Sequence, residues 1–384
     1  MIRHIASNAI TFLIVALFLL AGVIAWGGNT YRAEGPLETA ICLQVPSGSN
    51  FRDVRDDLTA EGAISQPWLF MAGADYSDKT NQLKAGSFLI EDGASMAEIV
   101  DAITGSGVST CGTEIVYRIG VTRSEVQVRE LDPATNRYGE VASFNPLEEE
   151  APAEYLEAKE GQDTRYRIAV AEGVTSWQIA NSLNAIDVLD GEIAEIPAEG
   201  SLAPDSYEFR PGDEASEIIA EMEGRQETIL ADAWANRADG VPLENPEEAL
   251  ILASIVEKET GVPEERGQVA SVFTNRLNEG MRLQTDPTVI YGITRGQGVL
   301  GRGLRQSELR GNTPWNTYVI DGLPPTPIAN PGRASIEAAL NPDSTDFIFF
   351  VADGTGGHAF ATNLADHNRN VAAWRAIEAE RANN

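Results

Sequence analysis

Apolar and polar positions follow one distinct pattern at the start of the chain. The segment AITFLIVALFLLAGVIAWGG contains an uninterrupted apolar run of about 18 residues, close to the ~20 that a helix needs to span a bilayer. Residues 9–27 are therefore predicted to form a transmembrane anchor, with residues 1–8 in the cytoplasm and the rest of the chain outside. A cleaved signal peptide is the alternative, but we find no convincing small-x-small cleavage site and the run exceeds the usual apolar length of such peptides.

A second pattern occurs three times, in VPSGSNFRDVRDDL, IEDGASMAEIVDAI and VAEGVTSWQIANSL. A glycine permits a tight turn, a small polar residue can cap a helix, and apolar residues then recur at helical spacing. Each segment is predicted to fold as strand, turn and helix. Together with helix-like PWLFMAGADYS and strand-like LKAGSFLI, the first resembles a LysM module, a small glycan-binding fold. Residues 40–107 are expected to form it, with a generic α+β domain as the alternative.

The remaining chain is predicted to complete an α+β protein. Alternating positions in TEIVYRIGV, SEVQVREL and YGEVASF predict short strands, so residues 108–165 are expected to form a β-rich insertion with an acidic connector. Residues 166–198 carry the third strand-turn-helix unit. Residues 199–384 are expected to form a mixed α+β catalytic domain, in which one helix begins at Pro246 and is ended by Gly261 and Pro263.

Composition narrows the possible functions. The chain has 384 residues and a formal net charge of −30, and such a surface repels polyanions, so nucleic acid is not an expected partner. Only His358 and His367 follow the apolar run, and no Cys/His cluster exists, so neither a metal nor a cofactor is expected. The two cysteines, Cys42 and Cys111, both lie in the exported part, where either a disulfide or two buried thiols would be possible.

Two glutamates near the end of an apolar helix are the strongest candidates for chemistry. In ILASIVEKETGVPEERG, Glu259 follows Leu252 and Ile255 at helical spacing, so it falls on the apolar side, whereas Glu257 is predicted to face solvent. Burial raises the pKa of a carboxyl, and a carboxyl that stays protonated can donate its proton to a leaving oxygen. Pairing of Glu259 with an arginine such as Arg266 is the purely structural alternative.

Long irregular loops after this helix contain aromatic rings beside amides, hydroxyls and a histidine, a mixture typical of a sugar cleft. The residues that we predict to line it are Gln284, Asp286, Tyr291, Asn316 and His358. Each of them alone could instead form a turn or fill a core. Asp286 is the only loop acid considered as a second carboxylate, whereas an enzyme that lets the hydroxyl of the substrate attack needs only one.

Several motifs, in this order, resemble one known family: LASIVEKETGVPEERGQVASVFTNRL, GMRLQTDPTVIYG, TPWNTY, GLPPTPIANPG and FVADGTGGHAFATNLADHN. They are similar to those of the membrane-anchored endolytic murein transglycosylases, the YceG-like family, from about Glu199 to Asn368. The anchor and the LysM-like segment fit that family as well. The insertion at 108–165 and the two cysteines depart from its pattern.

The resemblance implies an enzyme that cleaves the β-1,4 bond between N-acetylmuramic acid and N-acetylglucosamine inside peptidoglycan strands and leaves a 1,6-anhydro-muramyl end. It implies Glu259, the glutamate before threonine in EKET, as catalytic acid and base. It also implies an inner-membrane protein with a periplasmic catalytic domain, and penicillin-binding proteins as partners during termination of new strands. A non-catalytic wall-binding scaffold for cell-wall synthases and a water-using muramidase are the alternatives.

Overall fold

The computed structural model describes residues 2–105, 109–161 and 163–382, and residues 2–10 without their side chains. The chain divides into two compact units. The first contains Met1–Ile115, Gln127–Ser143 and Ala151–Arg165, and the second contains Val116–Val126, Phe144–Glu150 and Tyr166–Asn384. Residue 1, the predicted boundary at 107 and 108, and the last two residues of the predicted catalytic domain lie outside the described residues.

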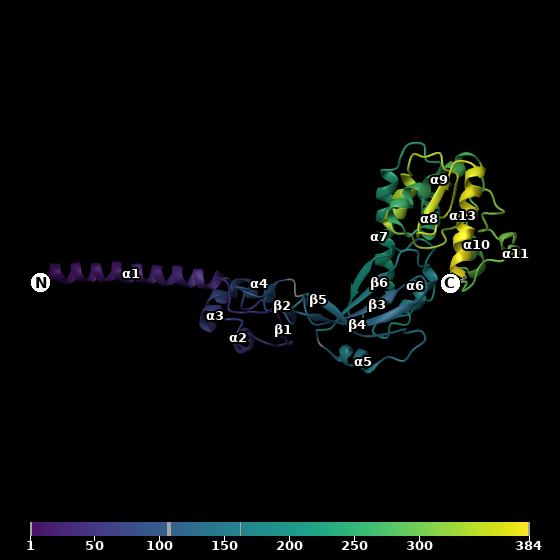
Figure 1. Ribbon diagram of the computed structural model, residues 1–384. Helices are drawn as coiled ribbons and strands as arrows, with labels where there is room; N and C mark the ends of the chain where they lie inside the picture. Colours follow the sequence, from purple (N-terminus) through teal and green to yellow (C-terminus); the bar gives the residue numbers. More distant parts are fainter. Residues whose placement is uncertain (1, 106–108, 162, 383–384) are drawn as a thin grey trace. The chain divides into compact units, whose positions relative to one another are not determined.

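The first unit begins with the long helix α1 (Ile2–Arg32), which is purple in Figure 1. Its segment Thr11–Arg32 is long and apolar enough to cross a membrane. Only 6% of the 18-residue apolar stretch within this segment is buried. The predicted helix is therefore present. Length and composition suit both an anchor and a signal sequence.

Two short strands and three helices follow α1 and share one apolar core. The order is β1 (Ile41–Val45), α2 (Phe51–Ala60), α3 (Pro67–Tyr76), β2 (Gly86–Ile90) and α4 (Met96–Thr104). β1 pairs antiparallel with β2, so that Leu43 lies opposite Phe88. Asn50 and Ser95 cap α2 and α4 through capping boxes, as the turn-helix pattern predicts. The strand-helix-helix-strand order is compatible with a LysM-like module, which remains a prediction.

The two cysteines are joined. A disulfide connects Cys42 on β1 to Cys111, with 5.7 Å between their Cα atoms. The bridge closes a loop that contains most of the first core, so the question left open by the sequence is answered in favour of a disulfide.

A five-stranded sheet follows, in the order β5-β4-β3-β6-β7. Its strands are β3 (Thr113–Ile119), β4 (Ser124–Asp132), β5 (Arg137–Phe144), β6 (Arg165–Val170) and β7 (Ser206–Phe209), and helices α5 (Ala153–Glu160) and α6 (Ser176–Leu183) lie between them in sequence. The strands predicted within residues 108–165 are present. They form one sheet with β6 and β7, and the assignment of this segment as an insertion stays a prediction.

Helices dominate the rest of the second unit. They are α7 (Ala215–Ala235), α8 (Pro246–Glu259), η1 (Pro263–Glu265), α9 (Arg266–Asn278), α10 (Asp286–Thr294), α11 (Gln306–Leu309), α12 (Arg333–Leu340) and α13 (Leu364–Ala382), with the hairpin β8 (Phe349–Ala352) and β9 (His358–Ala361) before α13. The predicted loop around Asp286 and Tyr291 is in fact α10. Asp286 and Pro287 are good helix-start residues, a signal that the irregular appearance of the flanking sequence obscures.

α8 is the central helix of this unit. It packs against α12, α9, α7 and α10. Ile255 and Val256 are fully buried as expected, but so are Ala253 and Ser254 on the predicted polar side. The prediction of a one-sided helix was therefore wrong, because neighbouring helices cover α8 on all sides from Ile251 to Val256.

Candidate active site

The position of Glu259 follows from the way α8 begins and ends. Asn245 accepts a hydrogen bond from the Glu248 N–H (2.9 Å), and Pro246 occupies the first turn. At the other end the Thr260 hydroxyl accepts from the Val262 N–H (3.0 Å), and the chain turns away. Glu259 is consequently the last helical residue and leaves the apolar core at its edge.

Around the Glu259 carboxyl, the structure provides one hydroxyl donor and several charges. The Thr285 hydroxyl donates a hydrogen bond to Oε1 of Glu259. Burial raises the pKa of Glu259 to about 7, the Thr285 bond and the charge of His358 lower it, and the charge of Asp286 raises it. A carboxyl with this pKa holds its proton in a large fraction of molecules near neutral pH.

Thr285 is itself held by two buried threonines. Its backbone N–H donates to the Thr317 hydroxyl (3.0 Å), which in turn lies 2.8 Å from the Thr288 hydroxyl. Thr288 and Thr317 are fully buried. This hydroxyl cluster fixes the start of α10 against the segment around residue 317, and thereby directs Thr285 at Glu259.

Asp286 and Tyr318 form a pair beside this cluster. The Tyr318 hydroxyl donates to Oδ1 of Asp286 (2.7 Å). Burial raises the pKa of Tyr318, and the bond to Asp286 raises it further, so the phenol remains protonated. Asp286 is exposed and near enough for its charge to affect Glu259.

His358 is held by a carboxylate that sequence reasoning missed. Glu265 accepts hydrogen bonds from the His358 backbone N–H (2.9 Å) and from its ring Nδ1 (2.7 Å). The side chains of Glu265 and His358 are only 18% and 15% exposed. The preceding residue must be small, since a Cβ on Gly357 would lie 2.3 Å from Glu265 Oε1. With Nδ1 bonded in this way, the other ring nitrogen remains available for the site.

Glu257 does not face open water, contrary to the prediction. It is partly buried and accepts a hydrogen bond from the backbone N–H of Gly332 (3.1 Å) at the start of α12. Burial raises the pKa of Glu172, and the charge of Glu257 raises it further, whereas the neighbouring Arg266 lowers it. Arg266 therefore pairs with Glu172, and the structural alternative in which it pairs with Glu259 is not what the structure shows. The two glutamates of EKET thus have different surroundings, and Glu259 has the raised pKa of a proton donor.

The other predicted residues fall into two groups. Gln284 is exposed and precedes Thr285 in the chain. Its backbone has a positive φ of 53°, and its N–H donates a hydrogen bond to the Thr317 carbonyl. Asn316, in contrast, is fully buried, and its amide donates to the carbonyls of Glu308, Leu309 and Gly311. An amide committed to three carbonyls cannot bind a ligand, so the prediction for Asn316 does not agree with the structure.

Tyr291 leads to a second buried carboxylate. Its hydroxyl donates to Glu199 (3.1 Å), which also accepts from the Ser176 N–H (2.9 Å), and its ring packs on Trp315. Burial raises the pKa of Glu199. No sequence pattern distinguishes Glu199 from an ordinary turn acid before glycine. Likewise, Glu265 looks like an ordinary acid at a helix start.

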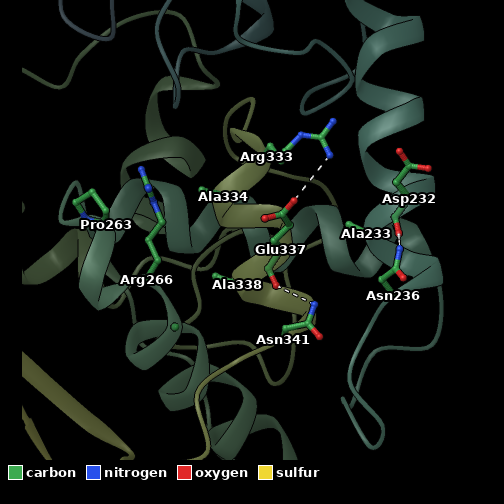
Figure 2. A pocket seen from close by; sticks show the side chains of 11 residues that line it. Asp232, Ala233, Asn236, Pro263, Arg266, Arg333, Ala334, Glu337, Ala338 and Asn341 are labelled. Atoms are coloured by element: carbon green, nitrogen blue, oxygen red, sulfur yellow. Dashed lines mark hydrogen bonds and ion pairs between the residues drawn. The ribbon is translucent and has the colours of Figure 1, made fainter.

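A cavity of about 560 Å³, which Glu259 does not line, is shown in Figure 2. It is lined by residues of α7, α9, α12 and η1: Asp232, Ala233, Asn236, Pro263, Arg266, Gly267, Arg333, Ala334, Glu337, Ala338 and Asn341. Its two acids and two arginines include the Arg333–Glu337 pair at 3.8 Å. Because Glu259 does not line it, the candidate site is defined by its chemistry and not by the volume of this cavity.

Known proteins similar to this chain include two curated relatives and one solved structure. An endolytic murein transglycosylase of Bacillus subtilis (strain 168) is 28% identical over 91% of this chain and 89% of its own length. An endolytic murein transglycosylase of Streptococcus pneumoniae (strain D39) is 28% identical over 96% of this chain, which spans only 65% of that protein. A crystal structure of a YceG-like protein from Listeria monocytogenes is 26% identical, with a TM-score of 0.45, over 86% of this chain and 99% of that one.

The match to a family covers the candidate site completely. Residues 145–373, well over half of the chain, match the YceG-like family. This range contains Glu259, Thr285, Tyr318 and the Glu265–His358 pair. The chain belongs to the YceG-like family.

Proposed function

We propose that this protein is an endolytic peptidoglycan lytic transglycosylase with Glu259 as its catalytic residue. The substrate is the β-1,4 bond between N-acetylmuramic acid and N-acetylglucosamine within a glycan strand. Membership of the family and the names of the relatives support the substrate class. The single observation that carries the mechanism is a partly buried carboxyl, held by the Thr285 hydroxyl, whose pKa burial raises to about 7.

In the first step, protonated Glu259 gives its proton to the glycosidic oxygen while the bond from the muramyl C1 to that oxygen breaks. The N-acetylglucosamine part leaves with a free hydroxyl. In the second step, the C6 hydroxyl of the same muramyl residue attacks C1, and the Glu259 carboxylate takes its proton. A 1,6-anhydro ring forms, the carboxyl recovers its proton, and no water is consumed.

The residues around Glu259 take supporting roles in this proposal. Thr285 orients the carboxyl, and exposed Gln284 beside it can bond substrate hydroxyls or acetamido groups. His358 supplies a positive charge that stabilises the carboxylate formed between the two steps. Asp286, engaged by Tyr318, opposes that charge and keeps the pKa of Glu259 high.

We further propose that α1 is an uncleaved membrane anchor, with the catalytic part in the periplasm beside the peptidoglycan synthases. The C-terminal end of α1 supports retention, because Tyr31 packs against the core of the first unit and Trp26 stacks on Trp68. A protein tethered in this way acts on nascent strands close to the membrane. Penicillin-binding proteins are its expected partners, and termination of new strands is its expected task.

The decisive experiment is to incubate the full-length protein in vesicles with uncrosslinked glycan strands and to identify product ends by mass spectrometry. Anhydro-muramyl ends are expected, and reducing ends would establish a water-using muramidase instead. Glu259→Gln should lower the cleavage rate by at least about 10²–10⁴-fold, since its amide cannot transfer protons. Glu257→Gln is the matched control and should retain cleavage. Unchanged turnover in a folded Glu259→Gln protein would exclude this mechanism, whereas a wild-type protein that binds glycan without cleaving it would be a scaffold.

A further inference from the structure

Helices α1 and α3 lie side by side in a constant register. The rings of Trp26 and Trp68 stack with centroids 6.2 Å apart. One residue further along each helix, Leu69 Cδ1 lies 3.5 Å from where a Cβ on Gly27 would be. Four residues further along, the Tyr31 ring lies beside Gly73, and a Cβ added to Gly73 would be only 2.2 Å from this ring. The residue numbers of each pair differ by the same amount, so the two helices run parallel.

This register sets the level of each α3 residue relative to α1. The apolar run of α1 ends at Trp26, the position at which aromatic residues mark the boundary between bilayer and water. Trp68, directly beside Trp26, is then at the same level. Tyr76 at the other end of α3 lies about 12 Å further along, at 1.5 Å per residue, on the side away from the bilayer.

Trp68 is suited to the boundary between lipid and water. Trp68 is 55% exposed although α3 packs against the core of the first unit, and Trp26 is 51% exposed. Its indole N–H donates to Gln66 Oε1 (3.1 Å), so the ring presents an apolar face together with a satisfied polar edge. Two adjacent exposed indoles of this kind suit the headgroup region, where the amphipathic ring of tryptophan is favourable.

We propose that the N-terminal end of α3, through Trp68, rests in the headgroup region of the bilayer next to Trp26. This inference depends on the proposed retention of α1 as an anchor. The first unit is then held against the membrane surface by two adjacent aromatic contacts and by the Tyr31–Gly73 packing, without a flexible linker. Its helix α3 stands parallel to the anchor, and its predicted LysM-like module is presented to glycan at a fixed height.

Hydroxyl-radical footprinting of the full-length protein in vesicles tests the inference residue by residue. Trp68 should be modified severalfold less when the protein is in vesicles than when it is free of lipid, while Tyr76, which is 95% exposed on the same helix, should not change. Flotation with the vesicles is the separate control for the anchor. A chain that does not float overturns the anchor, whereas one that floats with Trp68 still reactive overturns the inference alone. Anhydro-end formation, measured separately, reports on the proposed catalysis.

A pair of matched variants identifies what covers Trp68. Trp26→Phe and Trp26→Phe/Trp68→Phe differ only in this indole, so the difference between their fluorescence signals reports Trp68. Vesicles of phosphatidylcholine brominated near the headgroup end of the acyl chains should quench that difference signal. Protection of Trp68 without such quenching would show that a second protein copy or another protein covers it, and would overturn the proposal.

Discussion

Glu259 shows how one residue gains its chemistry from a balance of opposing effects. Burial raises its pKa to about 7, and Asp286 acts in the same direction. Thr285 and His358 act in the opposite direction, so that the acid and the carboxylate are both accessible near neutral pH. Both forms are required, because the proposed mechanism uses the acid first and the base afterwards.

The raised pKa predicts a pH-dependent stability difference between the wild type and Glu259→Gln. The folded wild type binds a proton more tightly than the unfolded chain, so its free energy of unfolding falls as pH rises from 4.5 through 7. The full loss is on the order of 3 kcal/mol. Residue 259 of the variant does not titrate in this pH range. The stability of the variant relative to the wild type should therefore be higher at pH 8 than at pH 4.5. Urea unfolding at the two pH values measures this, and parallel stability curves would contradict it.

The Glu265–His358 pair predicts a change in the pH profile of cleavage. Because the charge of His358 lowers the pKa of Glu259, His358→Gln should move the alkaline limb of the kcat/KM profile to higher pH. Glu265→Gln should shift it in the same direction, since His358 loses the carboxylate that holds its ring in place.

The neighbouring Glu264→Gln is the matched control, because Glu264 is exposed and the charge change is the same. Its profile should coincide with that of the wild type. Glu265 acts here as a positioning residue. A Glu265→Gln protein that merely melts earlier, with an unmoved profile, would show that the pair serves stability alone.

At the scale of elements, the site depends on connections between segments that are far apart in sequence. Asn330 is fully buried and joins the β6–α6 turn to the segment before α12. Its Oδ1 accepts from the Leu202 N–H (3.0 Å), and its Nδ2 donates to the Val174 carbonyl (3.0 Å). α6 is thereby fixed to the helical part that carries Glu259.

Asn330→Ala should therefore destabilise the second unit. It leaves the buried Leu202 N–H without its partner, which costs roughly 1–3 kcal/mol, while the Val174 carbonyl keeps the bond from the backbone N–H of residue 330. Asn341→Ala is the control, because Asn341 is exposed at the end of α12, and its effect should stay within about 0.5 kcal/mol. Denaturant unfolding measures both variants, and equal midpoints would refute the structural role of Asn330.

At the scale of the whole molecule, a disulfide stabilises the part that follows α1. Cys42 and Cys111 are separated by 69 positions, and Cys111 is fully buried. A crosslink over such a loop restricts the unfolded chain. It is compatible with an oxidising compartment outside the cytoplasm.

Removing the bridge should lower stability without removing activity. The double variant Cys42→Ser/Cys111→Ser is expected to lose about 2–4 kcal/mol of unfolding free energy, seen as a lower Tm. Glycan cleavage measured well below that Tm should persist, because neither cysteine belongs to the Glu259 site. A reduced wild-type protein should behave like the variant, and an unchanged Tm in both would contradict the prediction.

The sequence by itself determined the features that depend on neighbours along the chain. The length of an apolar run identifies α1, and capping residues with helical spacing identify α8 from Pro246 to its end. The same spacing favours Glu259 over Glu257, although α8 turned out to be covered on all sides. Local rules suffice here because helix limits and membrane-spanning length are properties of consecutive residues.

Only the tertiary structure decided which distant residues meet. Glu265 and His358 are separated by 93 positions, and Thr285 and Glu259 by 26. Asn316 looked like a ligand-binding amide but donates to three backbone carbonyls instead. The sequence also did not predict that β3–β5 form one sheet with β6 and β7. Nor did it predict the register of α1 with α3. Such contacts arise from the packing of whole elements, and a residue type or its spacing does not reveal which buried polar partner it will find.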